Sequence, residues 1–64
     1  MRELIYLKQA LEIEEKALNS AKACYEYYQR SGNKESADII KLIIDDDSNH
    51  IKAIHEMVKR FEKS

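Results

Sequence analysis

Apolar residues recur every three or four positions along almost the whole chain, which is the spacing of one face of an α-helix. The first series comprises Leu4, Leu7, Leu11, Leu18, Ala21, Tyr25 and Tyr28, and is broken once, at Glu14. The second comprises Ala37, Ile40, Ile44, Ile51, Ile54, Val58 and Phe61, and is broken once, at Asp47. The pattern predicts two long amphipathic helices, from about Arg2 to Arg30 and from about Lys34 to Glu62.

The two series are separated by Ser31-Gly32-Asn33, which contains the only glycine of a chain without proline. Glycine readily adopts the left-handed conformation that ends a helix, and asparagine is a favoured N-cap for the next helix. A turn this short makes the two helices antiparallel neighbours. Residues 1–64 are therefore predicted to form one domain, an all-α helical hairpin.

The apolar arc of each helix is wider than a two-helix seam requires. If the two series occupy the a and d positions of a heptad, neighbouring c and g positions are also apolar or small: Tyr6, Ala10, Ile13, Ala17, Cys24 and Tyr27 in the first helix, and Ile39, Ile43, Ala53 and Met57 in the second. Such an arc suits a helix with two neighbours. A 64-residue chain is also marginal as a monomer. The sequence thus predicts a homo-oligomer, at least a dimer, forming a four-helix bundle.

Composition excludes several classes of protein. Lys and Arg number 11 against 12 Asp and Glu, with a formal net charge of -1, which argues against a nucleic-acid-binding protein. No apolar run reaches the roughly 20 residues that span a bilayer, and Met1-Arg2-Glu3 leads directly into the helical pattern without a signal peptide. We therefore expect a cytoplasmic protein with no membrane partner. Cys24 is the only cysteine, so no disulfide framework is expected.

The polar residues that break the two apolar series are candidate metal ligands. Glu14 and Asp47 stand at core positions, and Asp46 and His50 flank Asp47 on the same arc. A buried carboxylate needs a partner, a cation or a proton. Two copies would bring together four carboxylates, carrying -4, and two histidines, and two divalent ions would balance that charge. Carboxylate oxygen with imidazole nitrogen suits iron, and also manganese or zinc.

One Glu helix paired with one Asp-x-x-His helix is half of a di-iron bundle site, which uses a Glu from two helices and Glu-x-x-His from two others. The stretches Glu12-Ile-Glu14-Glu-Lys-Ala17 and Ile44-Asp-Asp-Asp47-Ser-Asn-His50 resemble the first helical hairpin of rubrerythrins and other ferritin-like proteins. The resemblance implies a di-iron carboxylate site with two irons per dimer, held by Glu14, Asp47 and His50. It also implies ferroxidase activity, iron storage or peroxide handling.

The chain departs from the family pattern in two ways. Asp47 stands where the family usually has Glu and is one methylene shorter, so we expect it to ligate through one oxygen, with Asp46 as a reserve ligand. The family often has a tyrosine one to two turns after the first Glu, whereas here Ala21 occupies the stripe and Tyr25 is the nearest candidate. A cysteine-rich, rubredoxin-like segment is also missing from the sequence.

Simpler interpretations stand beside these. Glu14 and Asp47 can act as polar devices that fix helix register, and His50 as a core histidine beside a carboxylate. His55 is expected at the surface and Cys24 in packing. The alternative function is that of a metal-free hairpin dimer acting as a protein-binding adaptor or small regulator.

Overall fold

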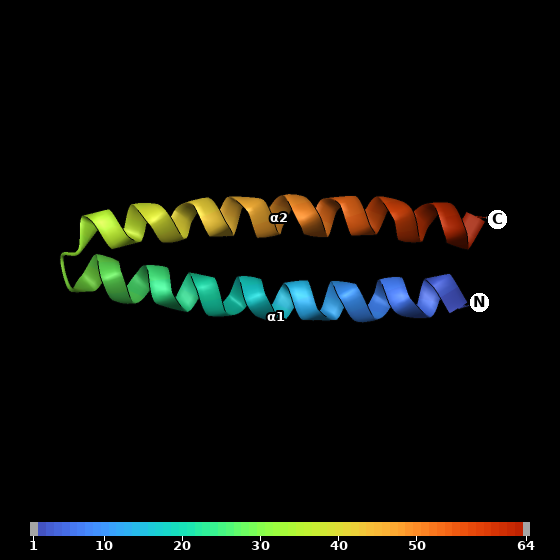
Figure 1. The fold of residues 1–64 in the computed structure, drawn as a ribbon, viewed down its shortest axis with the longest axis horizontal. Coiled ribbons are helices and arrows are strands. Elements are labelled where there is room, and N and C mark those ends of the chain that lie inside the picture. Colours follow the sequence, from blue (N-terminus) through green and yellow to red (C-terminus); the bar gives the residue numbers. More distant parts are fainter. Residues whose placement is uncertain (1, 64) are drawn as a thin grey trace.

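The computed structural model describes residues 2–63, which form two antiparallel helices, α1 (Arg2–Arg30) and α2 (Lys34–Lys63). The helices lie side by side along their whole length, so the start of α1 and the end of α2 lie together at the end opposite the turn (Figure 1). The principal-axis extents of the Cα trace are 49 × 14 × 11 Å. The predicted bounds of α1 and of the turn are confirmed, and α2 is one residue longer than predicted, within the usual variation of helix ends. Residues 1 and 64 of the predicted domain lie outside the described residues.

The turn follows from Gly32 and Asn33, as the sequence predicts. Gly32 has a φ of 73°, and its N–H donates to the carbonyl of Gln29 while the N–H of Asn33 donates to the carbonyl of Tyr28. These two bonds make a Schellman motif, which satisfies carbonyl groups that the end of α1 would otherwise leave unpaired. The side-chain oxygen of Asn33 then accepts a hydrogen bond from the N–H of Ser36 at 3.1 Å, capping α2.

Replacing Gly32 with alanine is expected to lower the free energy of unfolding by about 1 kcal/mol, because a Cβ is disfavoured at positive φ. A Cβ at this position meets no heavy atom within 4 Å, so the loss would come from backbone conformation alone. Gly32→Asn is the matched control and should lose less, since asparagine tolerates the left-handed region. Urea unfolding at a fixed protein concentration measures both. Equal losses in the two variants would show that backbone conformation is not the cause.

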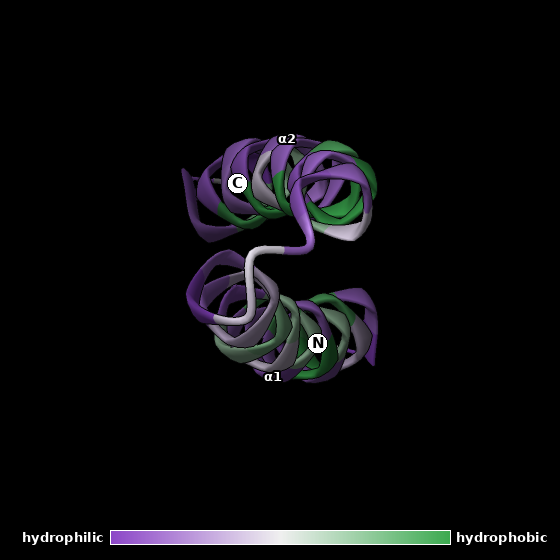
Figure 2. Ribbon diagram, turned by 90° about the vertical axis from the view of Figure 1, so that its left-hand side faces the viewer, coloured by the Kyte–Doolittle hydropathy of each residue, from purple (hydrophilic) through white to green (hydrophobic). Residues whose placement is uncertain are grey.

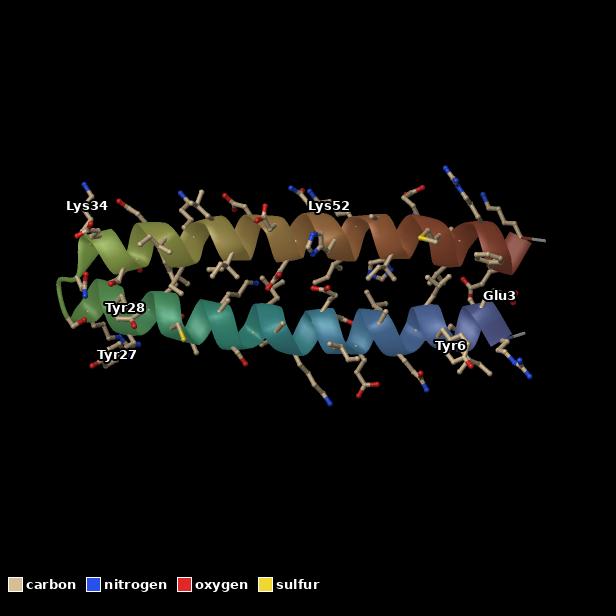
Figure 3. The ribbon with its side chains drawn as sticks, in the orientation of Figure 1. Glu3, Tyr6, Tyr27, Tyr28, Lys34 and Lys52 are labelled. Carbon is tan, nitrogen blue, oxygen red and sulfur yellow. The ribbon has the colours of Figure 1, made fainter. Side chains whose placement is uncertain are left out.

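The seam between the helices is formed by the two predicted series. All sixteen of their positions, Glu14 and Asp47 included, are buried or half-buried. Among the described residues only Ala21, Ala37 and Val58 are buried, with 4–9% of their surface exposed. Side chains from both helices meet along the seam (Figure 3). A single hairpin therefore shields its apolar stripe from one side only and encloses almost no core.

The seam divides the rest of the surface into two faces of opposite character. In an antiparallel pair, g positions of one helix lie on the same side as g positions of the other. Residues from α1 and α2 line one shallow apolar groove on this side, and they include Tyr6, Ala10 and Met57. On the other side, e positions meet in the ion pair between Lys8 and Glu62, at 3.8 Å. Hydrophobic residues accordingly lie toward one side of the ribbons and hydrophilic residues toward the other, most clearly in α2 (Figure 2).

We call the first side the apolar face. Its apolar and small residues are Tyr6, Ala10, Ile13, Ala17, Cys24, Tyr27, Ile39, Ile43, Ala53 and Met57. Six of these are large hydrophobic side chains that are 44–67% exposed: Tyr6, Ile13, Tyr27, Ile39, Ile43 and Met57. The opposite side, which we call the charged face, consists of the b and e positions, and within the described helices Ile5 is its one apolar residue. Neither described helix has an apolar stretch long enough to cross a membrane.

Candidate metal centre

The two residues that break the apolar stripes lie close to the midpoints of their helices. Glu14 is near the middle of α1 and Asp47 near the middle of α2, and both are half-buried in the seam. Leucine or isoleucine fills the neighbouring seam positions Leu11, Leu18, Ile44 and Ile51, so the helix pattern itself places the carboxylates in the seam. Their placement side by side depends on the turn, which sets the register of α2 against α1.

His50 completes a group of three with these carboxylates. It follows Asp47 by three residues, so the two side chains lie on the same face of α2. One ligand atom of each residue lies within 4.8 Å of those of the other two. The Nδ1 atom of His50 is 3.7 Å from Oε1 of Glu14, which is too long for a hydrogen bond. The side chain of Glu14 is 30% exposed and that of His50 is 60% exposed, so the group is open to solvent on the apolar face.

The donor chemistry of this group suits a transition-metal ion. Ligand atoms on one ion, each about 2.1 Å from it, lie at most roughly 4.2 Å apart. The three ligand atoms of the group lie within 4.8 Å of one another, so the side chains would have to move closer together to bind one ion. Two carboxylates and one imidazole suit iron, manganese or zinc. Three protein ligands leave coordination positions open for a further group.

The charged side chains close to the group are mostly negative. Within residues 2–63, the ion pairs formed by lysine and arginine involve Glu12, Glu26, Glu56 and Glu62, and none reaches Glu14 or Asp47. Asp46, at a neighbouring position of the apolar face, adds a further carboxylate. Among the described residues, neither half-buried carboxylate is paired with lysine or arginine, and the one side chain that could carry a positive charge beside them is His50, 3.7 Å from Glu14. A metal ion would supply the missing charge.

The other candidates from the sequence take separate places. Asp46, the reserve ligand, is exposed and lies outside the group of three. His55 is exposed on the charged face, as expected of a surface residue. Cys24 was expected in packing but is exposed in the single hairpin, because it lies on the apolar face and not in the seam. Within residues 2–63 no segment of the same chain covers that face.

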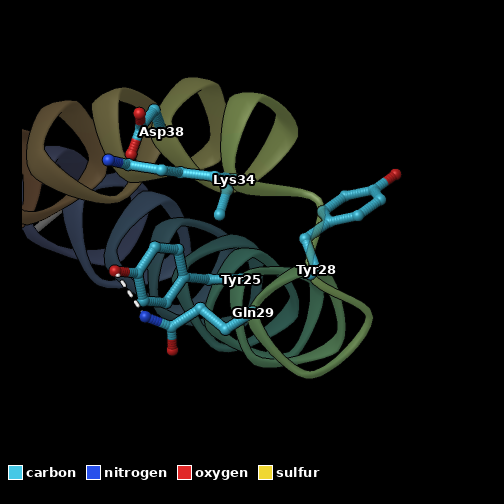
Figure 4. Close-up of a pocket in the computed structure, with 7 residues that line it drawn as sticks. Tyr25, Tyr28, Gln29, Lys34 and Asp38 are labelled. Atoms are coloured by element: carbon cyan, nitrogen blue, oxygen red, sulfur yellow. Dashed lines mark hydrogen bonds between the residues drawn. The ribbon is translucent and has the colours of Figure 1, made fainter.

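Tyr25 does not approach the metal-ligand group. It follows Glu14 by eleven residues, which corresponds to about 16 Å along the helix. Its hydroxyl accepts a hydrogen bond from Nε2 of Gln29 at 2.9 Å. With Tyr28, Lys34 and Asp38, it lines a separate open cavity at the turn (Figure 4). Within one chain, Tyr25 therefore does not take the place of the tyrosine that the family often has near its site.

Sequence analysis did not single out the apolar groove at the open end of the hairpin. Tyr6, Leu7, Ala10, Met57 and Phe61 line it together with Glu3. The c and g positions of Tyr6, Ala10 and Met57 could have indicated this groove. The residues form a groove only when α2 packs alongside α1.

In comparisons with known proteins, no family model, curated protein or solved structure matches the chain. The candidate site therefore rests on its own geometry.

Proposed function

We propose that two copies of the hairpin associate through their apolar faces into a four-helix bundle. Six large hydrophobic side chains are 44–67% exposed on that face, whereas the charged face carries one apolar residue. A face 49 Å long and roughly 20 Å wide, the width of two helices, offers about 1,000 Å². A standard interface buries about 800 Å² from each partner, so one such face is sufficient.

In this bundle the metal-ligand groups of the two chains would meet. The group lies near the midpoint of both helices, and His50 projects on the apolar face. A twofold axis through the middle of the bundle would therefore place Glu14, Asp47 and His50 beside their symmetry mates. The combined set of four carboxylates and two imidazoles matches the donor types of a di-metal carboxylate site. Two hairpins of this kind would form a complete bundle site from two half-sites.

The function that these observations support best is metal binding in a ferritin-like di-iron bundle, operating in the cytoplasm on ferrous iron or peroxide. The observation that carries the proposal is the grouping of Glu14, Asp47 and His50 at the centre of the hairpin, with ligand atoms within 4.8 Å. Glu14, Asp47 and His50 would hold the ions, and the apolar residues around them would limit access of water. A pair of iron ions would supply the redox chemistry for ferrous-iron oxidation or peroxide reduction.

Metal content measured together with absolute mass tests this proposal. Protein reconstituted anaerobically with ferrous iron is expected to hold about two irons per dimer and to develop an oxo-bridged absorption band in air. Zinc and manganese, loaded in parallel, show whether the site prefers iron. A clean dimer that binds none of the three metals would contradict the proposal and favour a register role for Glu14 and Asp47.

A further inference from the structure

The metal-ligand group and the apolar face are one surface, so whatever covers one also covers the other. His50 occupies a g position between Ile43 and Met57, one heptad from each. Its side chain is 60% exposed, and the Oε1 atom of Glu14 lies 3.7 Å behind it. Docking of a second chain on Ile43 and Met57 therefore also encloses His50 and, beneath it, Glu14 and Asp47.

The charges on this face oppose such docking when no metal is present. Around the group the apolar face offers neutral residues and one further carboxylate, Asp46. Among the described c and g positions Arg60 is the one cationic residue, and it lies ten residues from His50, about 15 Å along α2. A symmetric pair would thus bring at least four carboxylates that lack a lysine or arginine partner to the centre of one interface, with the two His50 imidazoles beside them. Each would lose part of its hydration there.

We infer that metal binding controls association: without metal, two copies of this chain associate weakly through the apolar face, and divalent ions convert them into a stable dimer. This inference rests on the proposed function and adds its regulation. The apolar side chains supply the attraction in both states. The ions remove the repulsion between the two groups and bind ligands from both chains. Because linkage is reciprocal, association also strengthens metal binding by the same factor.

Analytical ultracentrifugation of the full chain tests the inference. The dimer dissociation constant is measured in chelator, and again with zinc, a redox-inert probe, or with ferrous iron under nitrogen. At a metal concentration about a hundred times its own dissociation constant, the dimer constant is expected to fall at least about a hundredfold. Bound metal is quantified on the same samples.

A charge-neutral variant separates electrostatic repulsion from other causes. Glu14→Gln combined with Asp47→Asn removes the charges and keeps the shapes. In chelator this variant should dimerise about tenfold more tightly than the parent, because like charges no longer meet. It should not respond to metal. Glu15→Gln combined with Asp45→Asn makes the same charge change at exposed positions of the charged face, and its dimer constant should remain that of the parent.

Each outcome decides a different point. If the parent binds metal but dimerises equally well in chelator, the inference is overturned while the proposed metal site stands. If the parent binds no metal, the proposed function fails and the inference fails with it. If the two neutralised variants dimerise equally in chelator, repulsion at the ligand group does not limit association, which also overturns the inference. A metal-induced fall in the parent's dimer constant, lost only in the Glu14→Gln, Asp47→Asn variant, supports it.

Discussion

Replacing His50 with alanine is expected to weaken metal binding at least about a hundredfold while leaving the helices intact. The imidazole is the only nitrogen ligand of the group, and its Nδ1 lies 3.7 Å from Glu14. Removing even an outer residue that orients a ligand typically costs 10–100-fold in affinity, so removal of a ligand should cost at least as much. The fold should tolerate the change, because the side chain is 60% exposed and makes no hydrogen bond in the seam.

His55→Ala is the matched control for this experiment. It is the same substitution, five residues away on the same helix, at an exposed position of the charged face. Metal titration followed by calorimetry, with circular dichroism to verify helicity, compares the two variants with the parent. Similar affinities for the parent and the His50 variant would place the metal elsewhere. Loss of metal binding in both variants would show that the removal of any exposed histidine weakens binding, without a specific role for His50.

Replacing Ile43 with lysine should disrupt the dimer, with a dissociation constant raised at least about a hundredfold. Ile43 is 44% exposed in the single hairpin and lies on the apolar face one heptad from His50. Complete burial of an isoleucine is worth roughly 3 kcal/mol at most, so covering the exposed 44% of Ile43 stabilises an interface by about 1 kcal/mol. In a symmetric dimer the loss occurs twice, which gives about 2 kcal/mol, or a factor near thirty. Burial of the two new ammonium groups raises the total effect to at least about a hundredfold.

Leu42→Lys is a close control, since it makes the same type of change at the preceding residue. Leu42 is 65% exposed, more than Ile43, but it occupies an f position that faces away from both the seam and the apolar face. The dimer dissociation constant of the Leu42→Lys variant should stay within about twofold of that of the parent, as is usual for surface substitutions. Sedimentation equilibrium in the presence of metal measures both constants. A larger effect at Leu42 than at Ile43 would show that the interface lies on a different side of α2 from the one proposed.

The elements of this protein follow from local signals in its sequence. Spacing of three and four residues specifies the helices, and the single glycine followed by asparagine specifies where they separate. The observed bounds match because a helix forms from contacts within four residues and a turn from hydrogen bonds within five. The same spacing assigned all sixteen seam positions, Glu14 and Asp47 included, since a/d residues face the neighbouring helix wherever it lies.

The candidate site required more than spacing. That Asp47 and His50 share a face could be read from their separation of three residues. Their distance from Glu14, which lies 33 residues before Asp47, depends on the register that the Schellman turn sets between the helices. The distance of Tyr25 from Glu14, about three helical turns, follows from their spacing on one helix. The structure adds that Tyr25 lines the cavity at the turn.

The sequence by itself determined the two helices, their turn and the residues that line the seam, because each depends on neighbours along the chain. The tertiary structure decided which residues of α1 and α2 lie beside one another on the apolar face, which contains the Tyr6–Met57 groove and carries His50. That result depends on the register between the helices as well as on the antiparallel direction that the short turn imposes. An antiparallel return puts g beside g, whereas a parallel return would put g beside e and divide the apolar residues between two faces.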